Sequence, residues 1–186
     1  MCGEKPVIIR TLDLGADKYT QARSRIPERN PFLGCRSIRL CLQNIPMFKT
    51  QIRAILRASV SCQVSMFFPL ITNLMELRQA KTIVRDVIED LEEEGIDHCS
   101  DIPIGIMMET PSACLQAEAY ALEVDFFSIG TNDLVQYTLA VDRGNERVAS
   151  LFTPAHPSVL RLIKEVIRAG QRHDLSVSLC GEMATK

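Results

Sequence analysis

Short apolar runs alternate along the chain with longer segments whose apolar residues recur at helical spacing. The short runs have the length of strands, and the longer segments have the pattern of amphipathic helices. The predicted strands cover residues 7–9, 64–68, 104–108, 126–129 and 175–179. Because strands alternate with helices, the pattern predicts an α/β fold with a parallel sheet and helical crossovers.

The predicted helices cover residues 48–56, 74–91, 113–122 and 157–167, with a further helix after residue 133. Thr110 followed by Pro111 is typical of a helix start, with a capping residue before a proline at the first helical position. Residues 19–34 contain Pro27 and Pro31, which exclude a long helix. We therefore expect a long loop there.

Several of the predicted strands end in a charged or reactive side chain. These strand-end residues are Arg10, Glu109, Asn132 with Asp133, and Cys180. In a barrel of eight strand-helix units, groups at the carboxyl ends of the strands face one mouth. An open doubly wound sheet usually carries a Gly-rich phosphate loop, which this sequence lacks. We therefore predict a (β/α)8 TIM-type barrel.

We expect residues 1–186 to form a single domain of that barrel. The chain has 186 residues, whereas such barrels usually need about 250 residues. With only five or six strands, the barrel is expected to be incomplete at both ends.

The strand-end residues suggest chemistry on a phosphorylated acid. Glu109 and Asp133 can offer carboxylate oxygens to Mg²⁺, which takes one or two protein carboxylates together with substrate phosphate and water. Arg10, Arg36 and Arg143 can bind a phosphate or carboxylate through paired hydrogen bonds. Each charged residue taken singly is more typical of an exposed surface. Their repeated placement at strand ends favours a site.

Two alternatives stay open from the residues alone. Asn132 and Asp133 can simply cap the helix that follows them, as Asn and Asp often do. Cys180 is either a small core residue or a proton donor or nucleophile activated by nearby cations.

The composition is that of an ordinary globular protein, with 46% hydrophobic and 24% charged residues. A formal net charge of -2 argues against a general nucleic-acid binder, which usually shows a basic surplus. The seven cysteines are odd in number and form no CxxC pair, which indicates reduced thiols in the cytoplasm. No apolar run approaches the roughly 20 residues of a membrane span, so no membrane insertion is expected.

Six segments carry a family resemblance. They are VIIRTLDLGADK, NPFLGCRSIR, QIRAILRAS, GIMMETPSA, FFSIGTNDLVQYTLAVDRGN and SLCGEMA. In this order, through nearly the whole chain, they resemble the C-terminal phosphoenolpyruvate-binding domain of Enzyme I of the bacterial sugar phosphotransferase system. Pyruvate phosphate dikinase and phosphoenolpyruvate synthase share the barrel and similar motifs, but YTLAVDRGN, ETPSA and CGEMA look more like Enzyme I. A multi-domain phosphotransferase fusion stays open.

The resemblance implies a role for each strand-end residue. It implies that Arg10 and Arg143 bind phosphoenolpyruvate, with Arg36 close by, and that Asn132 contacts the substrate. It also implies that Glu109 and Asp133 bind Mg²⁺, with Asp133 beside the substrate as well, and that Cys180 protonates the enolate. Lys18 belongs to a segment that the family places near the site.

The sequence departs from the family in places. GADK stands where many relatives have two glycines, and Cys35 stands where they often have Trp. The phosphate-accepting histidine lies on a separate N-terminal domain in the family, and none of His98, His156 and His173 lies in a matching motif. We therefore expect a fragment that binds phosphoenolpyruvate but does not phosphorylate the carrier protein HPr alone.

The resemblance also implies a homodimer formed through this domain. A non-catalytic module that dimerises or binds phosphoenolpyruvate is the alternative, together with an enzyme of the dikinase or synthase type.

Overall fold

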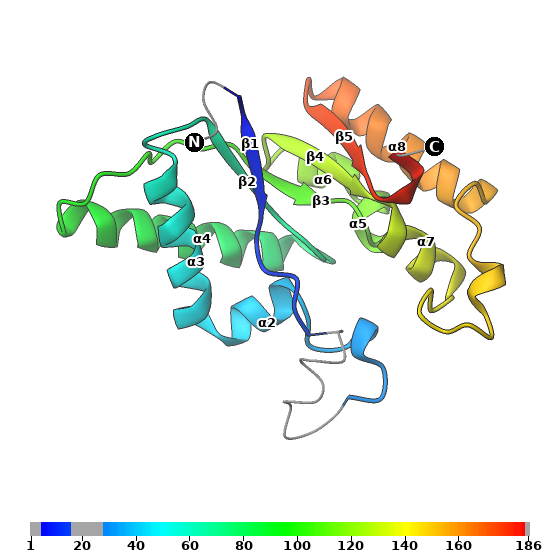
Figure 1. Ribbon diagram of the computed structural model, residues 1–186. Coiled ribbons are helices and arrows are strands. Elements are labelled where there is room, and N and C mark those ends of the chain that lie inside the picture. The colour runs from blue at the N-terminus through cyan, green and yellow to red at the C-terminus, as the bar shows by residue number, and fades with distance from the viewer. Residues whose placement is uncertain (1–4, 16–27, 185–186) are drawn as a thin grey trace. The chain divides into compact units, whose positions relative to one another are not determined.

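The computed structural model describes residues 5–15 and 28–184 (Figure 1). The chain divides into two compact units. Unit 1 holds Met1–Pro69 and Met75–Pro103, and unit 2 holds Leu70–Leu74 and Ile104–Lys186. The expected single domain stays a prediction. Within the described ranges, no helix combines the length and the apolar composition needed to cross a bilayer.

Unit 1 is built on two parallel strands. Strand β1 (Val7–Arg10) pairs in parallel with β2 (Val64–Phe68), with Val7 opposite Val64. Its helices are η1 (Pro31–Leu33), α2 (Ile38–Gln43), α3 (Ile45–Ala58) and α4 (Leu74–Glu93), of which Leu74 belongs to unit 2. The apolar face of α3 packs on β2, and the rings of Phe48 and Phe68 meet edge to face with centroids 6.0 Å apart. The core of unit 1 therefore lies between α3 and its strands.

Unit 2 is a three-stranded parallel sheet with helices. Strand β4 (Phe126–Gly130) lies between β3 (Ile104–Met107) and β5 (Ser176–Cys180) (Figure 1). Every residue of β4 is buried, as expected for a central strand that reads as a continuous apolar run. The helices are α5 (Pro111–Leu115), α6 (Ala117–Ala121), α7 (Thr131–Leu139) and α8 (Pro157–Arg172), with the short η2 (Ala149–Leu151) and η3 (Glu182–Ala184).

The α/β class with parallel strands is confirmed, and each predicted strand is found within one residue of its expected bounds. The closed eight-stranded barrel stays a prediction. The predicted start at Thr110 is also confirmed, because its side chain accepts a hydrogen bond from the Ala113 backbone N–H. Residues 19–27 of the expected loop lie outside the described ranges.

One helix prediction was wrong in part, and one helix of the structure was not predicted. The single helix expected over residues 113–122 is broken at Gln116 into α5 and α6. Both short helices bury residues and pack against α8, with Tyr120 of α6 fully buried, so we infer that tertiary packing overrides a run of good helix formers. Helix α2 was not predicted. It begins after Ser37, which has a φ of 57° and whose side chain forms no capping hydrogen bond.

Candidate functional site

Glu109 lies just beyond the end of β3 and is 1% exposed. Its Oε1 accepts a hydrogen bond from the Leu70 backbone N–H at 2.7 Å. A Cβ at Gly130 would lie 2.7 Å from its Oε2, closer than real Cβ atoms come to their neighbours. Glycine at the end of β4 therefore provides the space that this carboxylate occupies.

Asp133 lies in the first turn of α7 and is 6% exposed. A carboxylate in this position is stabilised by the positive end of the helix dipole. The N-cap residue of the helix is Gly130, which has no side chain to form a cap. Asn132 and Asp133 therefore lie inside the first turn and do not occupy the N-cap position.

The start of α7 is instead tied to the turn after β5. The Thr131 hydroxyl donates to the Cys180 carbonyl at 2.9 Å, and Asn132 Oδ1 accepts from the Glu182 backbone N–H at 3.1 Å. Gly181 has a φ of +98°, and a Cβ there would lie 2.5 Å from the Thr131 Oγ1 atom. This close approach requires glycine and fixes Asn132 beside the end of β5.

Cys180 is the last residue of β5 and lies opposite Gly130 in the parallel register. It is partly exposed, with its Sγ 3.3 Å from the Ile129 carbonyl oxygen and 3.6 Å from the Ser128 Oγ. Cys114 on α5 differs, because burial raises the pKa of its thiol to about 12. Cys114 thus behaves as a small core residue, whereas Cys180 lies at a strand end among polar atoms.

Arg143 lies in the segment that follows α7. Its Nη2 is 3.8 Å from the Asp133 Oδ1, and its side chain is 36% exposed. Its backbone N–H donates to the Gln136 Oε1 at 3.1 Å. A guanidinium has five N–H donors, so this long ion pair leaves it the capacity to bind an anion as well.

In unit 1, Arg10 and Arg36 share one carboxylate. Arg10 Nη1 is 3.1 Å from the Asp13 Oδ2, and Arg36 Nη2 is 2.8 Å and 2.9 Å from the two Asp13 oxygens. Arg36 is 4% exposed, and its guanidinium carbon lies 5.6 Å from the centre of the Phe32 ring. A Cβ at Gly15, where φ is +125°, would lie 2.7 Å from the Arg36 Cα. Arg36 is therefore held from several sides.

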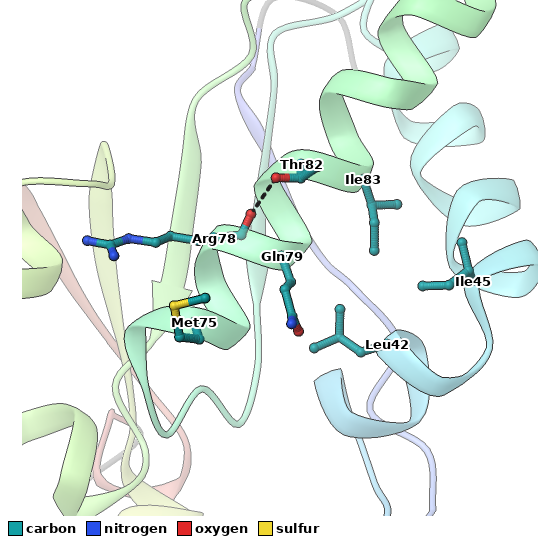
Figure 2. A pocket seen from close by; sticks show the side chains of 7 residues that line it. All are labelled: Leu42, Ile45, Met75, Arg78, Gln79, Thr82 and Ile83. Carbon is teal, nitrogen blue, oxygen red and sulfur yellow. Dashed lines mark hydrogen bonds between the residues drawn. The ribbon is translucent and has the colours of Figure 1, made fainter.

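A hollow of about 440 Å³ in unit 1 lies outside this cluster (Figure 2). Its lining residues are Leu42, Ile45, Met75, Arg78, Gln79, Thr82 and Ile83. In Figure 2 the Arg78 side chain extends away from Leu42 and Ile45. A phosphorylated acid needs several converging donors, so this mostly apolar hollow does not suit it.

The structure thus groups the predicted site residues within each unit. Unit 2 gathers Glu109, Asn132, Asp133 and Cys180 where its strands end, with Arg143 beside Asp133, and unit 1 gathers Arg10 and Arg36. Lys18 lies outside the described residues.

The sequence interpretation missed Asp13 and Gln136 as members of these groups. Asp13 follows the strand-end Arg10 by three residues, and Gln136 follows Asp133 by one helical turn. Both spacings are visible in the sequence, and both residues now have defined partners.

The residues present fit Mg²⁺. Among the described residues, no group of three or more His, Cys, Asp or Glu side chains suited to a metal is found. Mg²⁺ usually keeps several waters and takes only one or two protein carboxylates, together with substrate phosphate. Glu109 and Asp133 would supply that number, since both are buried residues whose carboxylates carry hard oxygen donors.

Unit 2 gathers carboxylates, an arginine and a thiol where its parallel strands end, which is where barrel enzymes carry their active sites. The family model for the PEP-utilising enzyme, PEP-binding domain, matches residues 1–186. The chain belongs to this family of phosphoenolpyruvate-utilising enzymes.

Relatives named phosphoenolpyruvate-protein phosphotransferase are similar along almost the whole chain. The Priestia megaterium protein is 51% identical over 180 residues, which is 97% of this chain and 31% of that protein. The Staphylococcus aureus protein is 50% identical over 182 residues, which is 98% of this chain and 32% of that protein. The chain therefore spans about a third of the length of these relatives.

Two solved structures share the fold at low identity. An HpcH/HpaI aldolase/citrate lyase family protein from Burkholderia cenocepacia has a TM-score of 0.58 and 15% identity, covering 99% of this chain and 74% of that one. A citrate lyase from Burkholderia xenovorans has a TM-score of 0.53 and 22% identity, covering 70% of this chain and 40% of that one. These similarities concern the fold alone.

Proposed function

We propose that this chain provides the phosphoenolpyruvate-binding part of a phosphoenolpyruvate-protein phosphotransferase and binds phosphoenolpyruvate together with Mg²⁺. The observation that carries the proposal is the pair of buried carboxylates, Glu109 and Asp133, with Arg143 3.8 Å from Asp133. The names of the relatives described above support the same activity.

Each predicted residue has a part in this proposal. Glu109 and Asp133 hold Mg²⁺, and Asp133 also lies against the substrate. Asn132 and Arg143 bind the substrate, and Arg10 and Arg36 are proposed to bind its phosphate or carboxylate as well. Bound Mg²⁺ lowers the free energy of the negative charge that develops on the transferred phosphoryl group and on the leaving enolate.

Cys180 completes the reaction in this proposal. When the phosphoryl group leaves, the remaining enolate of pyruvate needs a proton on its methylene carbon. The Cys180 S–H bond supplies that proton, which forms the new C–H bond and leaves a thiolate. The Ser128 hydroxyl, 3.6 Å from the sulfur, can donate a hydrogen bond to this thiolate.

The wider activity extends beyond the chain. We propose that the phosphoryl group passes to a histidine on another domain and then to HPr, in a cytoplasmic system for sugar uptake. We propose further that this chain forms an incomplete part of a (β/α)8 barrel and that the homodimer forms through it.

A non-catalytic dimerisation module is the second candidate. The mostly apolar hollow of unit 1 favours it, because Met75 on its rim is 58% exposed. An enzyme of the dikinase or synthase type finds less support, since the relatives described above carry the phosphotransferase name.

The test is calorimetric titration of phosphoenolpyruvate into the chain, with and without Mg²⁺, for the wild type, Glu109→Gln and Glu165→Gln. The amide introduced by Glu109→Gln can still accept the Leu70 N–H bond but lacks the charge, and Glu165 is a surface control whose side chain is 44% exposed. We expect Mg²⁺-dependent binding in the wild type and Glu165→Gln, weakened at least about tenfold in Glu109→Gln.

Sedimentation of the same variants separates the two candidates. If all variants dimerise and none binds phosphoenolpyruvate, the dimerisation module is the better account. If Glu109→Gln binds as tightly as the wild type, Glu109 does not hold the metal.

A further inference from the structure

Gln136 lies on α7 one helical turn after Asp133, and the two side chains share a buried face of that helix. Gln136 is 4% exposed and Asp133 is 6% exposed. Burying an amide costs free energy unless its polar atoms form hydrogen bonds. The buried Nε2 of Gln136 forms no hydrogen bond within the described residues, so the contacts of its oxygen atoms show what the residue does.

Gln136 accepts three hydrogen bonds from the segment that carries Arg143. Its side-chain Oε1 accepts the Arg143 backbone N–H at 3.1 Å. Its main-chain oxygen accepts the Ala140 backbone N–H and, at 3.0 Å, the Val141 backbone N–H. The first bond is specific to the glutamine side chain, whereas the other two belong to the helix end.

The segment held by these bonds has a defined conformation. Ala140 adopts a left-handed backbone with φ 54° and ψ 40°, a conformation that residues with a Cβ disfavour. Asp142 Oδ1 accepts the Gly144 N–H at 2.8 Å, and the Asn145 N–H donates to the Asp142 carbonyl at 3.1 Å. The turn is therefore ordered within itself, and the Gln136 side chain joins it to the face of α7 that bears Asp133.

We propose that Gln136 is a positioning residue, whose side-chain amide holds Arg143 at its place beside Asp133. Gln136 sets the separation between the candidate metal carboxylate and the candidate anion-binding guanidinium, which is 3.8 Å in the structure. The consequence for substrate rests on the proposed function. The positioning itself rests on the hydrogen bond and does not require that function.

The test compares substitutions that remove or keep the acceptor oxygen. Gln136→Met has a similar length without the acceptor, and Gln136→Asn keeps the amide but withdraws it by one methylene. Gln136→Glu keeps an acceptor oxygen at the same distance. Val166→Ala in the core of α8 is the control for a general loss of stability, because Val166 is fully buried in the same unit.

Two measurements are made on each variant. Nitrogen-detected NMR of the Arg143 guanidinium reports whether that group is held in one place, and titration of phosphoenolpyruvate with Mg²⁺ reports affinity. We expect Gln136→Met and Gln136→Asn to lose the distinct Arg143 signals and to bind about tenfold more weakly, equivalent to about 1.4 kcal/mol. Gln136→Glu and Val166→Ala should keep the signals.

The proposal is overturned if Arg143 keeps its signals in Gln136→Met or Gln136→Asn. It is also overturned if their affinity falls no further than that of Val166→Ala. If the wild-type chain binds no phosphoenolpyruvate, the proposed function fails for this chain, and the guanidinium spectra still decide whether Gln136 positions Arg143.

Discussion

The two units hold their charged strand-end residues in different ways. In unit 1 the two arginines share one protein carboxylate, because Asp13 accepts hydrogen bonds from both Arg10 and Arg36. In unit 2 the Glu109 carboxylate accepts a backbone N–H and occupies the space left at Gly130, and Arg143 Nη2 lies 3.8 Å from the Asp133 Oδ1.

This difference shows what each cluster is suited to do. The ion pair between Arg36 and Asp13 is almost fully buried. It therefore fixes the position of Arg36 and leaves little of the charge of these two side chains exposed. The Glu109 carboxylate, which accepts a backbone N–H, offers the kind of hard oxygen donor that Mg²⁺ prefers. The cluster in unit 1 is therefore a rigid arrangement, and the one in unit 2 has the features of a metal site.

The largest expected effect tests the rigid cluster. Asp13→Ala removes the carboxylate from Arg36, whose side chain is 5% exposed, and leaves a buried charge without this partner. We expect the free energy of unfolding to fall by about 3–5 kcal/mol, the usual cost of breaking a buried pair. Urea unfolding measures it.

The matched control for Asp13 is Asp86→Ala, also in unit 1. Asp86 lies 4.0 Å from Lys49 and its side chain is 48% exposed, so we expect a loss of at most about 1 kcal/mol. Equal losses in the two variants would contradict the contrast between a buried and an exposed pair.

A smaller loss of stability is expected at Gly130 in unit 2, where a side chain would collide with Glu109. Gly130→Ala places a Cβ 2.7 Å from the Glu109 Oε2 and 2.9 Å from the Met107 Cγ. Overpacking of this kind costs about 1–3 kcal/mol, and we expect the displaced Glu109 carboxylate to bind Mg²⁺ less tightly. Unfolding curves and Mg²⁺ titration check the two effects.

Gly144→Ala is the control for Gly130, because its Cβ would meet only the Asp142 Oδ1 at 3.3 Å. If Gly130→Ala is as stable as Gly144→Ala and binds Mg²⁺ as the wild type does, the space at Gly130 does not define the position of Glu109.

The third prediction uses one buried thiol in each unit. Burial, followed by the charge of Asp13, raises the pKa of Cys41 from 9.0 to about 11, and burial raises the pKa of Cys114 from 9.0 to about 12. The folded state thus favours the protonated thiols. The stability that the protonated thiols contribute is complete below pH 9. It is lost as the pH rises toward and through the pKa values of the two thiols in the folded state.

We expect unfolding free energy to fall above pH 9 by about 1.4 kcal/mol per pH unit for each thiol. Urea unfolding at a series of alkaline pH values measures the slope. Cys41→Ala and Cys114→Ala should each reduce the slope of unfolding free energy against pH by the contribution of one thiol. An unchanged slope in both variants would show that the buried thiols do not cause the pH dependence.

Much of the fold could be predicted because strand and helix periodicity act over a few residues. The five strands, the helix start at Thr110 and the helix that begins at Pro157 follow from such local patterns. The break at Gln116 could not be predicted, because it depends on packing against α8, whose first residue is about 40 positions further along the chain.

The candidate site divides in the same way. The sequence alone determined that Arg10, Glu109, Asp133 and Cys180 come at or near the ends of strands, since each follows closely on an apolar run.

Only the tertiary structure decided how such residues are held. Arg36 shares a carboxylate with Arg10, Gly130 makes room for Glu109, and Gln136 binds the Arg143 backbone. Distances between side chains that are far apart in sequence depend on which strands are neighbours and on how much volume each side chain occupies. Local pattern specifies neither of these quantities, so they are defined only when the chain packs.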